Sequence, residues 1–143
     1  MTQRVNFVKK MIAGSLLLLC TSPVLAQASI ELSIASSRND SIGNCWLTYQ
    51  FTNKTAVTLE SLWVSSRVVD KNNQLISTQD FYTSNLRPSR TLSNETSVDN
   101  VTCAEISRIV VESVTRCSGD GKDYTDCDEI LNLLPGRFRL TTK

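Results

Sequence analysis

An alternation of apolar and polar residues marks the first two predicted strands of the chain. In residues 27–36, Ile30, Leu32 and Ile34 alternate with polar neighbours, which is the period of two typical of a half-buried strand. A second strand is predicted over residues 45–52, and one of its faces carries Cys45, Leu47, Tyr49 and Phe51. The opposite face carries Trp46, Thr48 and Gln50. Both segments are therefore predicted to bury one face against a core.

The same pattern predicts five further strands. They cover residues 62–69, 75–82, 91–98 and 106–117, and a last strand made of 129–134 and 137–140. Residues 91–98 are polar and are predicted to lie at the edge of a sheet. The apolar residues of 106–117 also fit one face of a helix, but their many β-branched side chains favour a strand. Pro135 and Gly136 interrupt the last strand, which indicates a bend or bulge on an edge.

Seven strands with turn residues between them, and no convincing helix, predict an all-β fold. The expected architecture is a single antiparallel β-sandwich of the fibronectin type III or immunoglobulin-like kind. Of the 143 residues, 41% are hydrophobic and 20% are charged, which is the composition of a globular domain and not of a disordered chain. We place this one domain at residues 29–143.

Residues 1–28 have the pattern of a secretory signal peptide. Three positive charges precede the apolar run 11–20, namely Arg4, Lys9 and Lys10. Small residues follow that run at positions suited to cleavage after Ala26 or after Ala28. The apolar run is too short to span a bilayer, so the mature protein is expected to be soluble.

The leader has the features of a bacterial signal peptide, which predicts a secreted or periplasmic protein. An alternative is a lipid anchor on Cys20, but Leu19 is larger than the residue which that modification needs before the cysteine. The alternative is therefore disfavoured.

Four cysteines remain once the leader is removed, namely Cys45, Cys103, Cys117 and Cys127. An even number of cysteines in an oxidising compartment predicts two disulfides. Cys117 and Cys127 flank a turn-rich segment and are predicted to pair across a hairpin. Cys45 and Cys103 are then left as partners at one end of the sandwich. No two of the four have Cys-x-x-Cys spacing, so a structural role is favoured over a redox role.

The chain contains no histidine, which excludes imidazole bases, Ser-His-Asp and Cys-His nucleophiles, and His-bound metals. Without the leader, 12 Lys and Arg stand against 14 Asp and Glu, a net charge of about −2 that offers no basic field for nucleic acid. We therefore expect no enzymatic activity, no cofactor and no metal. An enzyme that uses carboxylates alone is the remaining catalytic alternative.

Five carboxylates gather in residues 120–129, and oxygen-rich loops can hold calcium. Their spacing matches no EF-hand, so a solvated hairpin tip is the favoured interpretation. Asp126 and Glu129 could in principle act as an acid and base pair. Nothing in the sequence places them in a cleft.

Trp46 and Trp63 are the candidate binding residues. In the simplest register each ring points away from the main apolar set of its strand, and exposed tryptophans are frequent anchors for protein partners. The alternative, that a ring fills the core, is favoured for each residue taken singly. Arg108, Glu112 and Arg116 would line an outward stripe of the strand at 106–117, for which an ordinary solvated face is favoured.

The order of several features resembles a known family of small secreted enterobacterial proteins, the interleukin receptor mimic protein A (IrmA) type. These features are the leader, CWLTYQF at residues 45–51, LRPSR at residues 86–90, and the cysteines of 103–117 and Cys127. The resemblance implies a fibronectin type III-like sandwich, a homodimer formed by strand exchange, and binding of host cytokines with a role in virulence. No binding residue is carried over from the family.

Two hypotheses about function follow from the sequence. The first is a secreted, non-enzymatic protein-binding module, with host interleukins as the partners that the resemblance implies. The second is a periplasmic or cell-surface structural or assembly subunit of a Gram-negative envelope. It is motivated by the polar strand 91–98 and the leading strand 27–36, either of which could be added to or exchanged.

Overall fold

The computed structural model describes residues 28–143 of the chain. The predicted leader lies outside the described residues except for Ala28, and so does a cleavage site after Ala26. Within the described part of the chain, no helix is long and apolar enough to cross a membrane.

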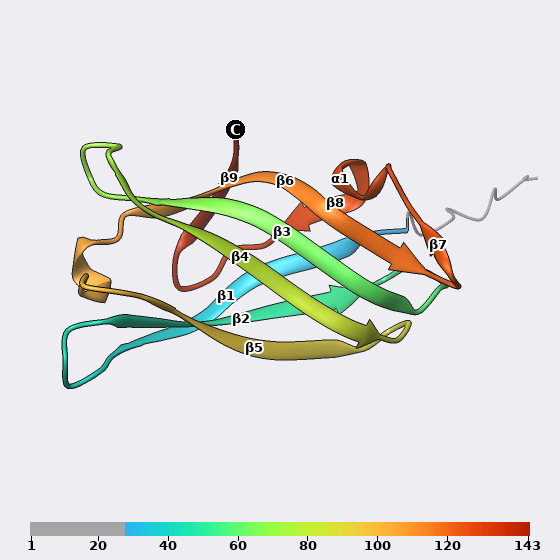
Figure 1. Ribbon diagram of the computed structural model, residues 1–143, viewed down its shortest axis with the longest axis horizontal. Helices are drawn as coiled ribbons and strands as arrows, with labels where there is room; N and C mark the ends of the chain where they lie inside the picture. The colour runs from blue at the N-terminus through green and yellow to red at the C-terminus, as the bar shows by residue number, and fades with distance from the viewer. Residues whose placement is uncertain (1–27) are drawn as a thin grey trace, which may run out of the picture.

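The strands of the described residues are arranged as two sheets that face each other in two layers (Figure 1). Sheet A has the strand order β5-β2-β1-β8, and sheet B has the order β4-β3-β6-β7 with β9 also paired to β6. The bounds of the strands are β1 (Ile30–Asn39), β2 (Cys45–Asn53), β3 (Leu59–Val69), β4 (Leu75–Leu86), β5 (Thr91–Val98), β6 (Arg108–Gly119), β7 (Lys122–Asp123), β8 (Leu131–Leu133) and β9 (Arg139–Thr142). Two short helical turns are η1 (Cys103–Glu105) and α1 (Cys127–Ile130).

The predicted all-β sandwich is confirmed, together with its two disulfides. The polar segment 91–98 forms β5 with the predicted bounds, and β5 lies at the edge of sheet A. The segment 106–117, which also fits a helical pattern, contributes the strand β6. The segment forms a strand and not a helix because its β-branched side chains pack well on a pleated surface.

The core lies between the two sheets and is built from alternate residues of the long strands. In β2 the four residues of the predicted buried face, Cys45, Leu47, Tyr49 and Phe51, have no exposed surface. The ring of Tyr49 lies 4.8 Å from that of Phe81 in the opposite sheet, and its hydroxyl donates to the carbonyl of Tyr82 at 3.1 Å. The phenol can be buried because its one polar group has this partner.

The C-terminal segment differs from the single bent strand that the sequence predicts. Residues 127–130 form the helical turn α1, and only Leu131–Leu133 continue as a strand, which pairs in parallel with β1. After Pro135 and Gly136 the chain crosses to sheet B, where β9 pairs in parallel with β6. The sandwich is therefore antiparallel apart from two short parallel pairings at its C-terminal end.

Gly136 explains why the chain can cross at this point. A Cβ atom at position 136 would collide with the backbone carbonyl oxygen of Ile34, so only glycine allows this close approach. On either side of the crossing, the amides of Leu134 and Arg137 donate to the carbonyls of Leu32 and Ile34 at 2.9 Å and 2.7 Å.

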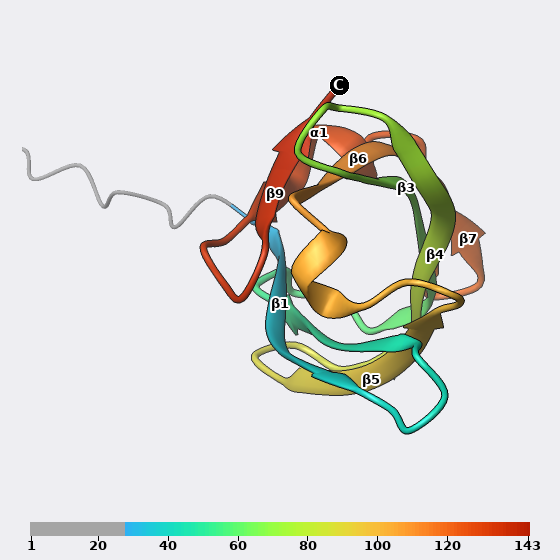
Figure 2. The same ribbon diagram turned by 90° about the vertical axis from the view of Figure 1, so that its left-hand side faces the viewer.

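The side of the sandwich opposite β8 and β9 is closed by side chains. Figure 2, which views the molecule from one end, shows β4 beside β5 at this boundary between the sheets. The amide of Gln79 on β4 donates to the carbonyl of Ser97 at 3.1 Å and accepts from the hydroxyl of Thr96 at 3.0 Å. The amide of Asn94 on β5 donates to the carbonyl of Tyr82 at 3.0 Å. The neighbouring edges of the two sheets are thus joined without a shared backbone ladder.

Both predicted disulfide pairings are present. Cys45 bonds to Cys103 at the end where β2 begins, and Cys117 bonds to Cys127 between β6 and α1. The first links β2 to the connection between β5 and β6, and the second holds α1 on β6. The two bonds therefore brace opposite ends of the sandwich.

Candidate binding surface

The outer face of sheet B carries an exposed aromatic pair on β3 and the edge strand β4. Trp63 on β3 and Tyr82 on β4 are register partners, and their rings stack with centroids 5.3 Å apart and an interplanar angle of 26°. Trp63 is 38% exposed and Tyr82 is 52% exposed, whereas Leu62 and Val64 on either side of the tryptophan are fully buried. The alternation of β3 therefore forces the indole outward, and nothing in residues 28–143 covers it as a second layer.

Arg116 lies on the other side of Trp63. It is the register partner of the tryptophan on β6, so β4, β3 and β6 place a tyrosine, a tryptophan and an arginine side by side across the sheet. Further along the same face, Arg67 Nε lies 2.8 Å from Glu112 Oε1. We call the group of Trp63, Tyr82 and Arg116 the aromatic face. Tryptophan, tyrosine and arginine are the residue types most enriched at the centres of protein interfaces.

The predicted outward stripe on β6 is broken by two irregularities. The register between β3 and β6 shifts between Trp63 and Val64 and again between Ser65 and Ser66. As a result, Val114 packs against the core rather than lying on the outer face. Arg108 turns to Asn73 and Glu112 to Arg67. Period-two counting fails at a bulge because each extra residue reverses the faces of those that follow.

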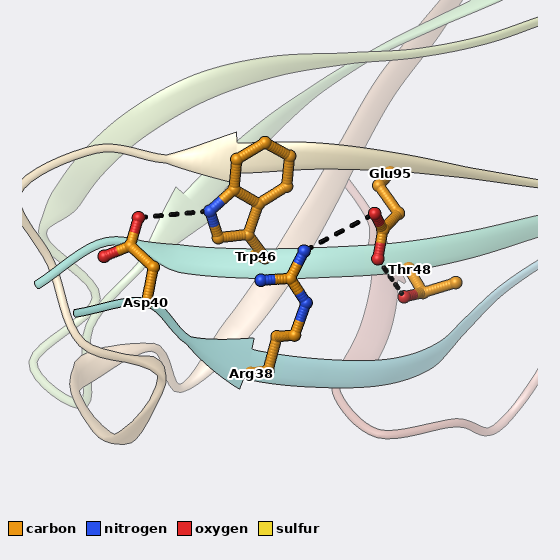
Figure 3. A network of polar contacts seen from close by, with 5 residues as sticks. All are labelled: Arg38, Asp40, Trp46, Thr48 and Glu95. Carbon is orange, nitrogen blue, oxygen red and sulfur yellow. Dashed lines mark hydrogen bonds and ion pairs between the residues drawn. The ribbon is translucent and has the colours of Figure 1, made fainter. Parts of the chain in front are cut away.

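Trp46 lies on the outer face of sheet A and is engaged by its own chain (Figure 3). Its indole Nε1 donates to Asp40 Oδ2 at 3.2 Å, and the guanidinium of Arg38 lies 5.0 Å from the ring centroid. Arg38 also pairs with Glu95 at 3.5 Å, and Glu95 accepts from the hydroxyl of Thr48 at 3.3 Å. The ring is half-buried, with its N–H and one face already in contact. Trp46 as a binding residue therefore stays a prediction.

Asp40 organises the loop beside Trp46. Its carboxylate accepts from the backbone amides of Ile42 and Asn44 at 3.0 Å and 2.8 Å, and from the side-chain amide of Asn44 at 2.9 Å. The backbone hydrogen bond from Asn44, supported by the indole N–H of Trp46, lowers the pKa of Asp40 to about 2. Hydrogen bonds to a carboxylate favour its charged form, so Asp40 stays ionised over the whole physiological range.

The sequence predicts turns at residues 37–44 and 70–73, but not the role of their aspartates. Asp70 repeats the arrangement of Asp40, because its Oδ1 accepts from the amides of Asn72 and Gln74, both at 2.8 Å. In both loops an Asp is followed three residues later by a residue with positive φ, Gly43 or Asn73, and four residues later by an amide side chain. This spacing, Asp-x-x-Gly/Asn-Asn/Gln, is the signal that could have identified them.

The acidic segment 120–129 is split among several elements. Asp123 lies in β7, which pairs with the end of β6, while Asp128 and Glu129 lie in α1. Asp128 Oδ1 accepts from the backbone amide of Val114 at 2.6 Å and so covers a stretch of β6 that neither β7 nor β9 reaches. Within residues 28–143, no group of three or more Cys, Asp or Glu side chains is close enough to hold a metal ion.

Comparison with known proteins supports the fold. A solved structure described as the structural characterization of IrmA from Escherichia coli matches this chain with a TM-score of 0.56 and 14% sequence identity. The match covers 82% of this chain and 100% of that chain. No protein-family model matches the sequence, and no curated protein matches it. The chain is therefore similar to IrmA in the arrangement of its strands.

Proposed function

We propose that this protein is an exported, non-enzymatic protein-binding module that recognises its partner through the aromatic face. The main support for this proposal is the stacked pair of Trp63 and Tyr82, with Arg116 in register beside Trp63. The pair exposes two large rings on the outer face of a sheet whose other face packs on the sandwich core. Burial of such rings supplies much of the free energy of protein association, and fixed rings lose little conformational freedom on binding.

Host interleukins are the proposed partners. This assignment rests on the resemblance of the sequence to the interleukin receptor mimic family, and the shared fold is compatible with it. Two disulfides fit an extracytoplasmic location. The absence of histidine from the sequence supports binding over catalysis. Dimerisation by strand exchange, which the same resemblance implies, is part of the proposal and is tested by light scattering.

The alternative of an envelope assembly subunit has less support. The leading strand β1 is paired with β2 along its length and with β8 at Ile30–Leu32, so the first part of the strand offers no free edge for an added strand. At the outer edge of β5, the carbonyl of Ser97 already accepts from Gln79. Part of the edge of each strand that motivated the alternative is therefore engaged by other residues of the described chain.

A titration tests the proposed function. The oxidised protein comprising residues 29–143 would be titrated against purified interleukins by surface-based interferometry, and we expect saturable binding to at least one of them. Trp63→Ala and Tyr82→Ala should each weaken that binding by about tenfold or more, because truncation of an interface hot spot costs about 2 kcal/mol.

Leu134→Ala provides the matched control, because Leu134 has the same 38% exposure as Trp63 but lies outside the aromatic face. Its affinity should equal that of the wild type. Absence of saturable binding to every interleukin would refute the proposed partner. Binding that survives both aromatic substitutions would refute the proposed face. Circular dichroism of each variant shows whether the fold is kept.

A further inference from the structure

The turn between β4 and β5 carries two arginines beside a surface hollow. The hollow has a volume of about 450 Å³ and is lined by Asn85, Arg87, Arg90, Thr91 and Leu92. The lining residues thus include two arginines and no acidic residue. This segment includes LRPSR at residues 86–90, and none of these residues belongs to the aromatic face.

The turn is fixed from beneath by a buried asparagine. Asn53 has no exposed surface, and its side-chain amide donates to the carbonyls of Val57 and Leu86, both at 2.8 Å. Its backbone amide donates to the carbonyl of Arg90 at 3.0 Å, and its carbonyl accepts from the amide of Ser89 at 2.7 Å. The backbone N–H and C=O of Asn53 therefore both hold the backbone of the turn. The arginine side chains take no part in these hydrogen bonds.

Among residues 28–143, no ion pair balances the positive charge of this corner. Lys54 follows Asn53 directly and adds a third cation. The ion pairs present among residues 28–143 involve Arg38 and Arg67 and none of these three cations. Two carboxylates lie on neighbouring strands. Glu31 on β1 is the register partner of Thr52 on β2, and Glu60 on β3 accepts from the backbone amide of Gly121. Neither lines the hollow.

The arginine side chains of the lining indicate the class of ligand that the hollow would bind. Guanidinium groups bind phosphate through paired N–H donors. Leu92, which is 39% exposed, supplies an apolar wall beside them. A phosphate group attached to a small organic body would use both parts of the hollow. We propose that this hollow is a binding site for a phosphate group, held by Arg87 and Arg90. The site lies outside the aromatic face and does not rest on the function proposed for that face.

The experiment has two arms, which separate soluble phosphate from a lipid headgroup. In the first arm, glycerol 3-phosphate is titrated into the oxidised protein of residues 29–143, and the Nε–H signals of the arginines are followed by NMR. In the second arm, the protein is sedimented with phosphatidylcholine vesicles that contain or lack phosphatidic acid. Saturable shifts confined to Arg87 and Arg90, or sedimentation that requires phosphatidic acid, would each support the site and identify its source of phosphate.

Variants decide whether the two arginines form the site. Arg87→Ala with Arg90→Ala should weaken binding by at least about tenfold, and the lysine pair Arg87→Lys with Arg90→Lys should recover it only in part, because an ammonium cannot make the paired contacts. Both arginines are exposed and the turn is held by backbone contacts, so these proteins should fold. Arg139→Ala with Lys143→Ala removes the same charge elsewhere and should bind like the wild type.

Three results would overturn the proposal. The first is no binding in either arm. The second is equal loss of binding in the alanine pair and in the control pair. The third is full binding by the lysine pair together with equal binding of a tetra-aspartate peptide, which would reduce the corner to a diffuse positive charge without a phosphate site.

Discussion

At the scale of single residues, carboxylates in this protein mainly shape the backbone. Asp40 and Asp70 each hold a hairpin loop by accepting from backbone amides. Glu105 accepts from the amide and hydroxyl of Thr102 at the start of η1, at 2.7 Å and 2.8 Å, which lowers its pKa. Such contacts satisfy donors that would otherwise lack partners in the loops. Of the three, Asp40 also orients a tryptophan.

The titration of Asp40 gives a prediction at this scale. Its pKa in the folded protein is about 2, below the ordinary value of 3.8. A carboxyl whose pKa is lowered by folding stabilises the fold above its unfolded pKa, and this contribution is lost as pH falls toward the folded pKa. We therefore expect the loop of residues 40–44 to loosen between about pH 4 and pH 2.

The measurement is the carboxyl carbon shift of Asp40 by NMR, with the emission of Trp46 in a Trp63→Phe background as a second reporter. Both should change with a midpoint near 2. Asp40→Asn should abolish the change in emission over this range. A midpoint near 3.8 for the carboxyl would contradict the hydrogen-bonded carboxylate seen in the structure.

At the scale of elements, the buried Asn53 joins two loops of the fold. It ends β2 and connects the β2–β3 loop to the turn after β4 through its amide and its backbone. We expect Asn53→Ala to lower the free energy of unfolding by about 2–4 kcal/mol, because the buried carbonyl of Leu86 would lose its donor and the backbone amide of Thr55 its acceptor. Urea denaturation measures this. Asn72→Ala, on an exposed loop, should change it by less than about 0.5 kcal/mol; equal effects of the two substitutions would contradict the role assigned to Asn53.

Most of the elements could be predicted from the sequence, and the failures have identifiable causes. The buried face of β2 follows from alternation, because one side of that strand meets the core. The polar residues of β5 agree with its place at the edge of sheet A. The helical turn α1 was missed because the disulfide of Cys127 holds it on β6, which is a tertiary constraint. The crossing at Gly136 was missed because periodicity carries no information about which sheet a strand joins.

The candidate site was less predictable than the fold. Strand alternation points Trp63 outward, whereas a place in the core was the favoured expectation for each tryptophan, and the structure leaves Trp63 exposed. Its partners Tyr82 and Arg116 come from two other strands. Their registers depend on bulges that a single sequence does not reveal. The phosphate hollow was missed for a related reason, since the residue that fixes it, Asn53, is distant in sequence and reads as an ordinary turn residue.

At the scale of the whole molecule, the two disulfides should contribute unequally to stability. Cys45–Cys103 joins residues 58 apart, and Cys117–Cys127 joins residues 10 apart. On the chain-entropy model, loss of the longer loop should cost about 4 kcal/mol and loss of the shorter about 3 kcal/mol. Urea unfolding of the paired variants, Cys45→Ser with Cys103→Ser and Cys117→Ser with Cys127→Ser, measures both. The reverse order would show that contacts of α1 outweigh loop closure.

The crossing of the C-terminal segment has a consequence for the lifetime of the folded protein. One short tail supplies the terminal rung of both layers, through β8 on β1 and β9 on β6. Detachment of that tail would uncover unsatisfied main-chain donors and acceptors on both layers in a single event. Proteolytic removal of the C-terminal residues would then expose both sheet edges and promote aggregation. The rate at which this tail detaches should therefore limit how long the folded protein persists.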